Sequence, residues 1–208
     1  MGLAEPIHAL SNCNQNGDEM ETGLMNFVKS DRGWMSGVAG TDIVTIGDPR
    51  LKAETEVIDD AQEVADLLAG MVDRLRELNG AGLAAPQIGA SVKVVVVEVR
   101  KTDVFPDRPI SPLLQMVNPV ITEQFGKTET GWEGCFSVPG LMGLVPRAEA
   151  ITVEYTSADG IDVRKQYSGY VARVIQHEID HLGGVEFVDR MTSMESLTTV
   201  TNYLEFHR

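Results

Sequence analysis

The chain has 208 residues, of which 43% are hydrophobic and 23% are charged, a composition that is ordinary for a globular protein and suits one domain. Its formal net charge of −14 argues against a general affinity for nucleic acid or anionic membranes. The longest apolar run, Val94–Val97, is far shorter than the roughly 20 residues of a membrane-spanning helix, so no such helix is predicted.

The cysteines and the amino-terminal segment favour a cytoplasmic protein. Cys13 and Cys135 are too few for a disulfide framework in a chain of this length, and they suit a reducing compartment. Residues 1–40 carry acidic side chains and lack a sustained apolar core, whereas a transit peptide is Arg-rich and poor in acids. We therefore predict a loosely ordered amino-terminal extension at 1–40. An organelle matrix is the alternative location.

The first predicted elements follow this extension. A short extended run at Ile43–Ile46 stops at Gly47–Pro49. Asp59 or Asp60 can cap a helix that Gly80 is placed to end. Its apolar residues recur at steps of three and four: Val64, Leu67, Leu68, Met71, Leu75 and Leu78.

The middle of the chain predicts strands and loops. Val92–Val99 has the composition of a buried strand, and Lys101–Pro112, with three prolines, is typical of a loop. Met116–Phe125 predicts a strand interrupted at Asn118–Pro119. Two further strands are predicted to flank a hairpin turn at residues 157–160: Ile151–Tyr155 and Ile161–Tyr167. A helix, then several strands, then a final helix indicates the α+β class.

The final helix, from Ser168 or Gly169 to Leu182, contains the pattern His-Glu-x-x-His at His177, Glu178 and His181. Positions i and i+4 share one face of a helix, so the two imidazoles can hold one metal ion. The carboxylate between them can then reach a metal-bound water. A solvated helix face is the plainer interpretation, but His is an uncommon residue and its presence at this spacing favours a metal site.

A metal centre needs at least one further protein ligand. In metzincin-type proteases it is a His six residues past the second one, but Phe187 stands there, which excludes that class. A thermolysin-like centre would use a downstream Glu, for which Glu195 and Glu205 are candidates. Cys135 is the other candidate: a lone Cys is more often a core residue, but Gly134 beside it allows a close backbone approach.

The stretch Gly80–Gln87 (Gly-Ala-Gly-Leu-Ala-Ala-Pro-Gln) has small residues that leave room for another backbone or a substrate. The amide of Gln87 can donate a hydrogen bond to a developing oxyanion. A helix C-cap followed by a tight turn would give the same stretch, and we weigh the two interpretations equally.

Together, three stretches resemble the three signature motifs of the peptide deformylase family, in the same order and at similar separation: residues 80–87, Glu-Gly-Cys-Phe-Ser at 133–137 and Gln-His-Glu-Ile-Asp-His-Leu at 176–182. Gly47–Leu51 and Val145–Arg147 are also similar to that family. The resemblance covers about Ile43 to Met191. It implies antiparallel or mixed β-sheets around the motif helix and a catalytic domain at 41–192. The C-terminal tail at 193–208 lies outside the resemblance and is predicted to be helical.

The resemblance also implies an activity, the removal of the N-formyl group from the formyl-methionine of new polypeptides. The resemblance implies that Cys135, His177 and His181 hold one divalent metal ion per chain. Fe²⁺ is the expected ion, and Zn²⁺, Ni²⁺ and Co²⁺ are the alternatives. A metal-bound water attacks the formyl carbon, with Glu178 as general base and acid. The oxyanion is met by the metal and by two further donors, the Gln87 side chain and the Phe136 backbone N–H.

Further roles follow from the same resemblance. An extended peptide pairs with the segment around Gly82, and Val174 lies in the wall of the methionine pocket. Three polar residues are expected to orient the histidines or Gln87: Glu133, Gln176 and Asp180. The implied partners are nascent N-formylated polypeptides, met in transient proximity to the ribosome, without direct binding of nucleic acid or membrane.

The chain departs from many family members at two positions. It has Phe136 where many bacterial members have Leu, and Met142 where many have an Arg that helps to shape the substrate cleft. The peptide preference near Met142 is therefore not predicted by the resemblance. Some members dock on the ribosome through a basic C-terminal helix. Met194–Arg208 has Arg208 as its one full positive charge, so we expect weak or absent ribosome binding through this tail.

Two alternatives remain beside the deformylase interpretation. A zinc endopeptidase would use His177, His181 and a downstream Glu, and it predicts that Glu205→Ala loses the metal whereas Cys135→Ala keeps it. A deformylase-like domain recast as a binding module would lack turnover, and the absence of Arg at Met142 is its support. The three motifs in register favour the enzyme.

Overall fold

The computed structural model describes residue 38, residues 41–102 and residues 105–208, so the extension predicted at 1–40 lies almost wholly outside the described residues. The described strands form an antiparallel sheet in the order β1-β2-β3-β4-β5, and β6 pairs with β4. The strands are β1 Gly82–Ala84, β2 Val94–Val97, β3 Leu114–Cys135, β4 Val138–Ser157, β5 Asp162–Ser168 and β6 Thr198–Thr199. The α-helices are α2 Ala65–Glu77, α3 Gly169–Leu182, α4 Phe187–Arg190 and α5 Val200–Phe206. The 3-10 turns are η2 Pro49–Lys52, η3 Ala61–Val64, η4 Ala85–Ile88 and η5 Met194–Ser196.

Strand β2 lies between two helices. Val94 and Val96 belong to the apolar cluster that includes α2, whereas Val95 and Val97 belong to the cluster that includes α3. Successive side chains of a strand point to opposite faces, so a strand buried on both faces is apolar at every position. This explains the unbroken valine run, and it confirms that the run forms a buried strand.

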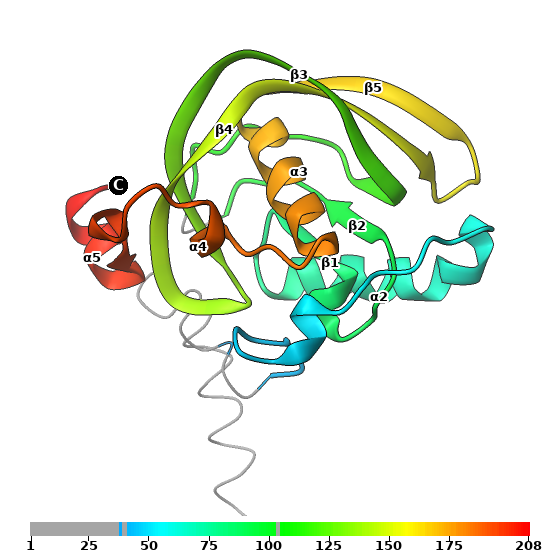
Figure 1. Ribbon diagram of the computed structural model, residues 1–208, viewed down its shortest axis with the longest axis horizontal. Helices are drawn as coiled ribbons and strands as arrows, with labels where there is room; N and C mark the ends of the chain where they lie inside the picture. The colour runs from blue at the N-terminus through cyan, green and yellow to red at the C-terminus, as the bar shows by residue number, and fades with distance from the viewer. Residues whose placement is uncertain (1–37, 39–40, 103–104) are drawn as a thin grey trace, which may run out of the picture.

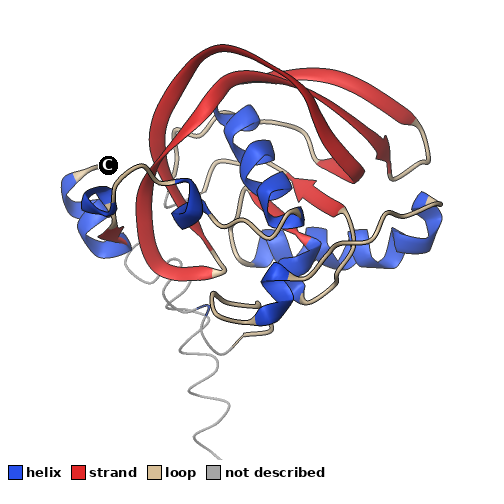
Figure 2. Ribbon diagram, in the orientation of Figure 1, coloured by secondary structure: helices blue, strands red, loops and turns tan. Residues whose placement is uncertain are grey.

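Strands β3 and β4 form a long, strongly curved hairpin. Their antiparallel register shifts at four places, among them Val117/Val120 and Gly134/Cys135. Each β-bulge bends the strand that carries it, so a hairpin with several bulges curves instead of lying flat. In Figure 1 β3, β4 and β5 arch over α3, and Figure 2 shows the same strands in red over the blue helix. The motif helix is therefore enclosed by the sheet, and the α+β class predicted from the sequence is confirmed.

Burial on α3 extends beyond the predicted apolar stripe. Ile175 and Leu182 are buried as expected, but Val171 and Ile179 are only partly buried. The polar motif residues are buried as well: Gln176, His177, Glu178 and His181 have exposed fractions of 6%, 8%, 4% and 1%. A solvated helix face would leave these side chains in water, so that interpretation is wrong. Charged and polar groups buried at this depth need partners or a ligand.

The predicted first helix is present, with a different end. The Asp60 side chain accepts a hydrogen bond from the Gln62 backbone and caps η3, which leads into α2. Gly80 was expected to end the helix, but Asn79 adopts the left-handed conformation, with φ of 54°, and the Gly80 N–H donates to the Leu75 carbonyl. Asn tolerates this conformation, so the chain turns one residue earlier.

The predicted interruption at Asn118–Pro119 is a bulge inside a continuous strand. Asn118 takes a positive φ of 52°, and its side chain bonds the backbone N–H and carbonyl of Ile58, at 3.0 and 2.7 Å. The strand then continues to Cys135, well past the predicted end at Phe125. The hairpin around residues 157–160 is present between β4 and β5. The described residues of Lys101–Pro112 contain neither helix nor strand.

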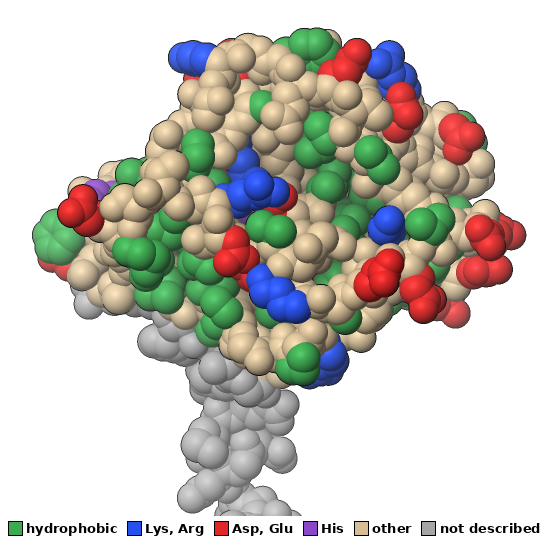
Figure 3. Space-filling model, viewed as in Figure 1, with side chains coloured by type: hydrophobic (Ala, Val, Ile, Leu, Met, Phe, Trp, Pro, Cys, Tyr) green, Lys and Arg blue, Asp and Glu red, His purple; other side chains and the backbone are tan. Residues whose placement is uncertain are grey.

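Acidic side chains gather at one end of the surface in Figure 3. This end carries η3 and the turn between β4 and β5, where Asp59, Asp60 and Asp159 are exposed. This gathering accords with the negative net charge of the whole chain. In the described part of the chain, no helix is long and apolar enough to cross a membrane.

Gly70→Ala is expected to stabilise the protein. Gly70 is exposed in the middle of α2, and a methyl group at this position would meet no atom within 4 Å. Alanine loses less conformational entropy than glycine in a helix interior, so the free energy of unfolding should rise by about 0.5–1 kcal/mol. Urea unfolding measures the change. A lower midpoint would show that α2 does not form here as described.

Candidate metal centre

Three buried side chains converge at the centre of the molecule. Cys135 ends β3, and His177 and His181 lie one turn apart on α3. Their potential ligand atoms all lie within 4.8 Å of one another, and Cys135 Sγ lies 3.2 Å from His181 Nε2. The bulge at Gly134/Cys135 redirects the end of β3 at this point. The sheet and the helix together therefore bring one sulfur and two imidazoles to one place.

This set of donors fits a divalent metal ion. A thiolate with two imidazoles suits zinc, iron, cobalt and nickel. Burial lowers the pKa of His181 well below its usual value, which keeps that imidazole neutral, as a ligand must be. Its Nδ1 is buried and has no hydrogen-bond partner among the described residues.

The glutamates that a thermolysin-like centre would need lie elsewhere. Glu195 is exposed in η5 and Glu205 is exposed on α5. Neither belongs to the group of close donor atoms found in the described part of the chain. The geometry therefore favours Cys135 over either glutamate as the third donor.

Glu133 fixes the ring of His177. Its Oε2 lies 2.9 Å from His177 Nδ1, which leaves Nε2 of that ring as the atom available to a metal. Arg147 donates to both carboxylate oxygens at 3.0 Å, and Arg173 donates to Oε1 at 2.8 Å. Burial alone would raise the pKa of Glu133, but the hydrogen bonds from His177 and Arg147 outweigh it and hold the pKa at about 2. The carboxylate is therefore ionised at neutral pH.

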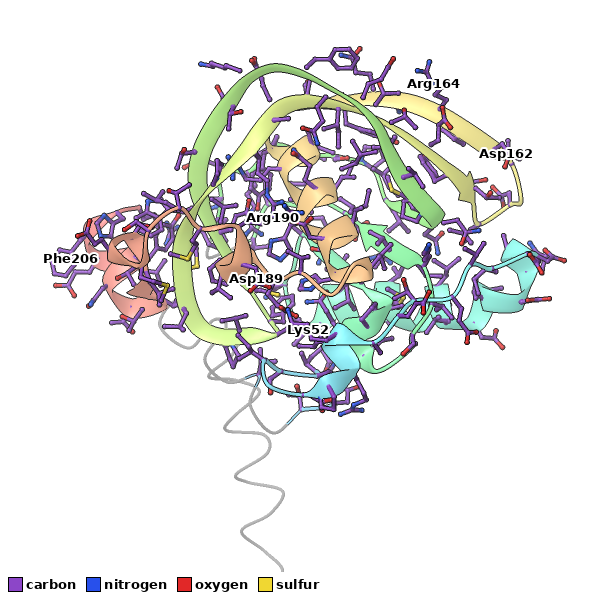
Figure 4. All side chains as sticks on the ribbon, in the orientation of Figure 1. Lys52, Asp162, Arg164, Asp189, Arg190 and Phe206 are labelled. Atoms are coloured by element: carbon purple, nitrogen blue, oxygen red, sulfur yellow. The ribbon has the colours of Figure 1, made fainter. Side chains whose placement is uncertain are left out.

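The ion pairs continue outward to the surface. Arg147 Nη1 lies 2.5 Å from Asp180 Oδ2, and Arg190 Nη2 lies 2.7 Å from Asp180 Oδ1. Figure 4 labels Arg190 and Asp189 on α4, with Lys52 close to Asp189, and Lys52 Nζ lies 3.0 Å from Asp189 Oδ2. These contacts tie the segment after α3 to the body of the protein and stabilise the pair formed by Arg147 and Glu133.

Asp180 and Gln176, which were expected to orient the histidines or Gln87, do not contact these side chains directly. Asp180 contacts Arg147 and Arg190, so it can affect His177 only through Arg147 and Glu133. The Gln176 amide bonds the backbone of Ala148 and Ala172, and among the described residues it has no hydrogen bond to a histidine or to Gln87. Neighbouring helix positions point about 100° apart, which turns Gln176 toward β4.

Gln87 is held with its amide nitrogen toward the thiol. Its Oε1 accepts a hydrogen bond from the Ala84 N–H at 2.8 Å, and its Nε2 lies 3.3 Å from both Cys135 Sγ and Ser137 Oγ. The stretch 80–87 thus begins with the helix-capping bond from the Gly80 N–H to the Leu75 carbonyl and continues as β1 and η4, so the helix cap is present but a strand separates it from the turn.

Glu178 is a buried carboxyl beside the donors. Burial raises its pKa to about 7, and its Oε2 has no hydrogen-bond partner in the described part of the chain. It lies directly against Gly82, where any Cβ would overlap the carboxyl group. Glycine at this position therefore allows β1 and the motif helix to pack closely.

A cavity of about 190 Å³ opens from the donors. Its wall includes the residues that the resemblance assigned to substrate binding, Gly82, Met142 and Val174, together with Phe136. Six further residues of the wall were not predicted from the sequence: Phe105, Arg108, Trp132, Tyr170, Arg173 and Tyr203. Arg173 had a usable signal, because it lies four residues before His177 on the same helix face. Phe105 and Tyr203 come from a loop and from the tail, where no local pattern indicates the site.

The metal-free protein is expected to lose stability in acid partly through Glu133. The pKa of Glu133 is about 2 in the folded protein and roughly 4.3 in the unfolded chain. Its contribution to the free energy of unfolding is therefore present above the unfolded pKa and is lost as pH falls through about 2. Urea midpoints measured between pH 5 and pH 2 should therefore fall more steeply for the parent than for Glu133→Gln. Equal slopes for the two proteins would contradict this role.

The chain is similar in sequence and fold to enzymes of one kind. The family model described as polypeptide deformylase matches residues 41–197. Peptide deformylase 1 of Nitrosomonas europaea is 39% identical over 154 residues, which cover 73% of this chain and 88% of that relative. The peptide deformylase of Thermomicrobium roseum is 42% identical over 158 residues, covering 74% of this chain and 88% of that relative.

Solved structures of similar fold include peptide deformylases. The Met-Ala-Ser-bound class I type b peptide deformylase from Acinetobacter baumannii has a TM-score of 0.68 and 37% identity, and the match covers 72% of this chain and 96% of that one. A peptide deformylase from Synechococcus elongatus in complex with actinonin has a TM-score of 0.67 and 31% identity, covering 78% of this chain and 83% of that one.

Proposed function

The chain belongs to the polypeptide deformylase family, and from this premise we propose how its own residues remove the formyl group. As a member of that family it is a metal-dependent hydrolase that acts on N-formylated new polypeptides and releases formate. One observation supports the assignment of roles most strongly. Cys135, His177 and His181 meet in a buried cluster, with Glu178 beside them, and Cys135, His177 and Glu178 line a cavity.

We propose that these three donors hold one divalent metal ion per chain. Fe²⁺ is the proposed ion, with Zn²⁺, Ni²⁺ or Co²⁺ as alternatives, because the thiolate and imidazoles suit all four. When bound, the metal supplies a Lewis acid and increases the acidity of water. Glu133 keeps the tautomer of His177 fixed by its bond to Nδ1, and Arg147 and Arg173 keep Glu133 in place.

Glu178 is the proposed general base and acid. Its free Oε2 accepts the proton of the attacking water and passes it to the nitrogen of the departing amine. Its pKa of about 7 in the metal-free protein, raised by burial, suits a group that must both take and give a proton near neutral pH. A nearby cation would favour the ionised form. The backbone of Gly82 fixes one side of this carboxyl group.

Gln87 and Phe136 are the proposed oxyanion donors. Gln87 Nε2 points at the metal centre because its Oε1 is already bonded to the Ala84 N–H. The Phe136 backbone N–H directly follows the thiol ligand in the chain. Loss of one donor of this kind typically lowers kcat by about 10²–10³-fold.

The proposed substrate is an extended formyl-peptide. Its main chain pairs with β1 at Gly82, and the methionine side chain enters the cavity between Val174 and Met142. We place the reaction in the cytoplasm, close to the ribosome on which new chains emerge. Because Arg208 is the one full positive charge of the tail at 194–208, we propose weak or absent ribosome binding through that segment.

Formate release tests the reaction class. Protein purified without oxygen and loaded with Fe²⁺ or Ni²⁺ should release formate from formyl-Met-Ala-Ser and leave acetyl-Met-Ala-Ser intact. Metal bound at one ion per chain, with no formate from any formyl-peptide, would contradict the proposed function.

Gly82→Ala is expected to lower kcat by roughly 10–100-fold while metal binding is kept. A methyl group at this position would overlap the Glu178 carboxyl and displace it, and small displacements of a catalytic group are costly. Gly70→Ala is the matched control, since its methyl group meets nothing. Activity of Gly82→Ala within twofold of the parent would show that Glu178 need not occupy this position.

A further inference from the structure

The last eleven residues of the chain build part of the cavity, although they lie beyond the family match at 41–197. Strand β6 pairs with β4 directly at the cavity wall, Leu141 opposite Thr199 and Met142 opposite Thr198. Val200, which follows β6, is 1% exposed and belongs to the same apolar cluster as Met142. Helix α5 is therefore held against the site by backbone pairing and by burial.

Aromatic contacts fix the helix beside the wall of the cavity. The Tyr203 ring lines the cavity and lies 5.5 Å from the Trp132 ring, centroid to centroid. His207 packs on the same tryptophan at 4.8 Å, and the Arg208 guanidinium lies 5.5 Å from the centroid of Phe105. Helix α5 thus contacts β3 through Tyr203, and Arg208, which follows the helix, contacts the loop that carries Phe105.

The other side of α5 faces solvent. Asn202 and Phe206 are exposed, and Figure 4 shows Phe206 at the outer end of this helix, pointing away from the body. Tyr203 is only partly exposed, and burial raises the pKa of its phenol, which stays neutral at ordinary pH. The inward face of the tail thus offers a neutral aromatic surface to whatever occupies the cavity.

The wall of the cavity combines two kinds of side chain. Cys135, His177 and Glu178 are polar, whereas Phe105, Trp132, Tyr170 and Tyr203 contribute aromatic rings, with the Arg108 guanidinium stacked on Phe105. A substrate whose formyl group reaches the donors must place its first side chain in this same cavity. Aromatic rings contact a thioether favourably, and they limit the size of the side chain that fits.

We propose that Tyr203 is a specificity-determining residue of this chain, contacting the side chain of the formylated residue and forming the outer wall of its pocket. This inference rests on the proposed function, since it assumes that a formyl-peptide occupies the cavity. Tyr203 does not take part in the chemical step. Its removal should alter which side chain is accepted more than it alters the rate at saturation.

The test compares kcat/KM for formyl-Met-Ala-Ser and formyl-Phe-Ala-Ser at equal metal content. Tyr203→Ala should raise KM for the methionine peptide and should lower kcat/KM less for the phenylalanine peptide than for the methionine peptide. The ratio of kcat/KM for the methionine peptide to that for the phenylalanine peptide should therefore fall about tenfold. Tyr203→Phe keeps the ring and should restore most of that ratio. Asn202→Ala, an exposed change on the same helix, is the control and should behave as the parent does.

Binding gives a second readout that does not need turnover. Calorimetry with the product peptide Met-Ala-Ser should show at least fivefold weaker binding to Tyr203→Ala than to the parent. The inference would be overturned if Tyr203→Ala lowered kcat/KM equally for both formyl-peptides, or if it changed neither the ratio of the two kcat/KM values nor the binding of the product peptide. Either result would leave the proposed function intact. A parent that releases formate from neither peptide would instead overturn the proposed function, and this inference with it.

Discussion

Cys135→Ala is expected to remove stoichiometric metal binding and to lower formate release by a hundredfold or more. The substitution deletes the sulfur from a set of three donors that lie within 4.8 Å of one another, and leaves only the two imidazoles of α3. Loss of a residue that merely orients a ligand already costs about 10–100-fold in metal affinity or activity, so loss of a ligand should cost at least as much. Metal analysis of the purified protein and a formate assay on the same sample measure both effects.

The matched control is Glu205→Ala. Glu205 is exposed on α5 and lies outside the donor cluster, so this variant should keep its metal and its activity. The opposite pattern, with metal retained by Cys135→Ala and lost by Glu205→Ala, would identify the ligand set of a zinc endopeptidase. The pair of variants therefore distinguishes two ligand sets that share both histidines.

Glu178→Gln is expected to lower kcat by about 10²–10⁴-fold, the usual contribution of a positioned general base, with metal binding and KM little changed. The glutamine side chain has nearly the same shape and can fill the same buried space against Gly82. It cannot accept a proton from water or return one to the leaving amine. Steady-state kinetics at several peptide concentrations, with the metal content measured, separate kcat from KM.

Glu195→Gln makes the same chemical change at an exposed position in η5 and should leave the kinetics unaltered. If Glu178→Gln keeps its metal and stays within tenfold of the parent kcat, another group carries the proton. Loss of the metal in Glu178→Gln would instead mean that the side chain supports the metal centre itself.

The motif helix and the α+β class could be predicted because their signals are local. His177 and His181 share a face through the 3.6-residue period of a helix. The unbroken run at Val94–Val97 likewise indicates a strand covered on both sides. Each of these inferences needs only a few neighbouring residues.

The length of the β3–β4 hairpin was not predictable by the same reasoning. Residues 122–128 are all exposed, so no alternation of buried and exposed side chains marks them as a strand. Bulges such as the one at Asn118 also shift the phase of any alternation along the strand. Pairing with β4 holds these residues in the sheet, and that long-range contact leaves no local pattern.

The outer wall of the cavity escaped prediction for a related reason. Tyr203 follows the metal ligands by more than twenty residues, and it reaches the site only because β6 pairs with β4 and Val200 is buried. Phe105 reaches it from a loop without regular structure. Gln176 is an error of the opposite kind. It lies in the motif and was expected to orient the site, but its amide bonds the backbone of Ala148 in β4.

The most direct test of the account is a metal titration of the parent protein. Fe²⁺ or Ni²⁺ is added anaerobically to the metal-free chain, and formate release from formyl-Met-Ala-Ser is recorded at each step. The account predicts that activity rises in proportion to metal and reaches a plateau at one ion per chain. Full occupancy at one ion per chain without formate, or formate release that does not depend on metal, would contradict it.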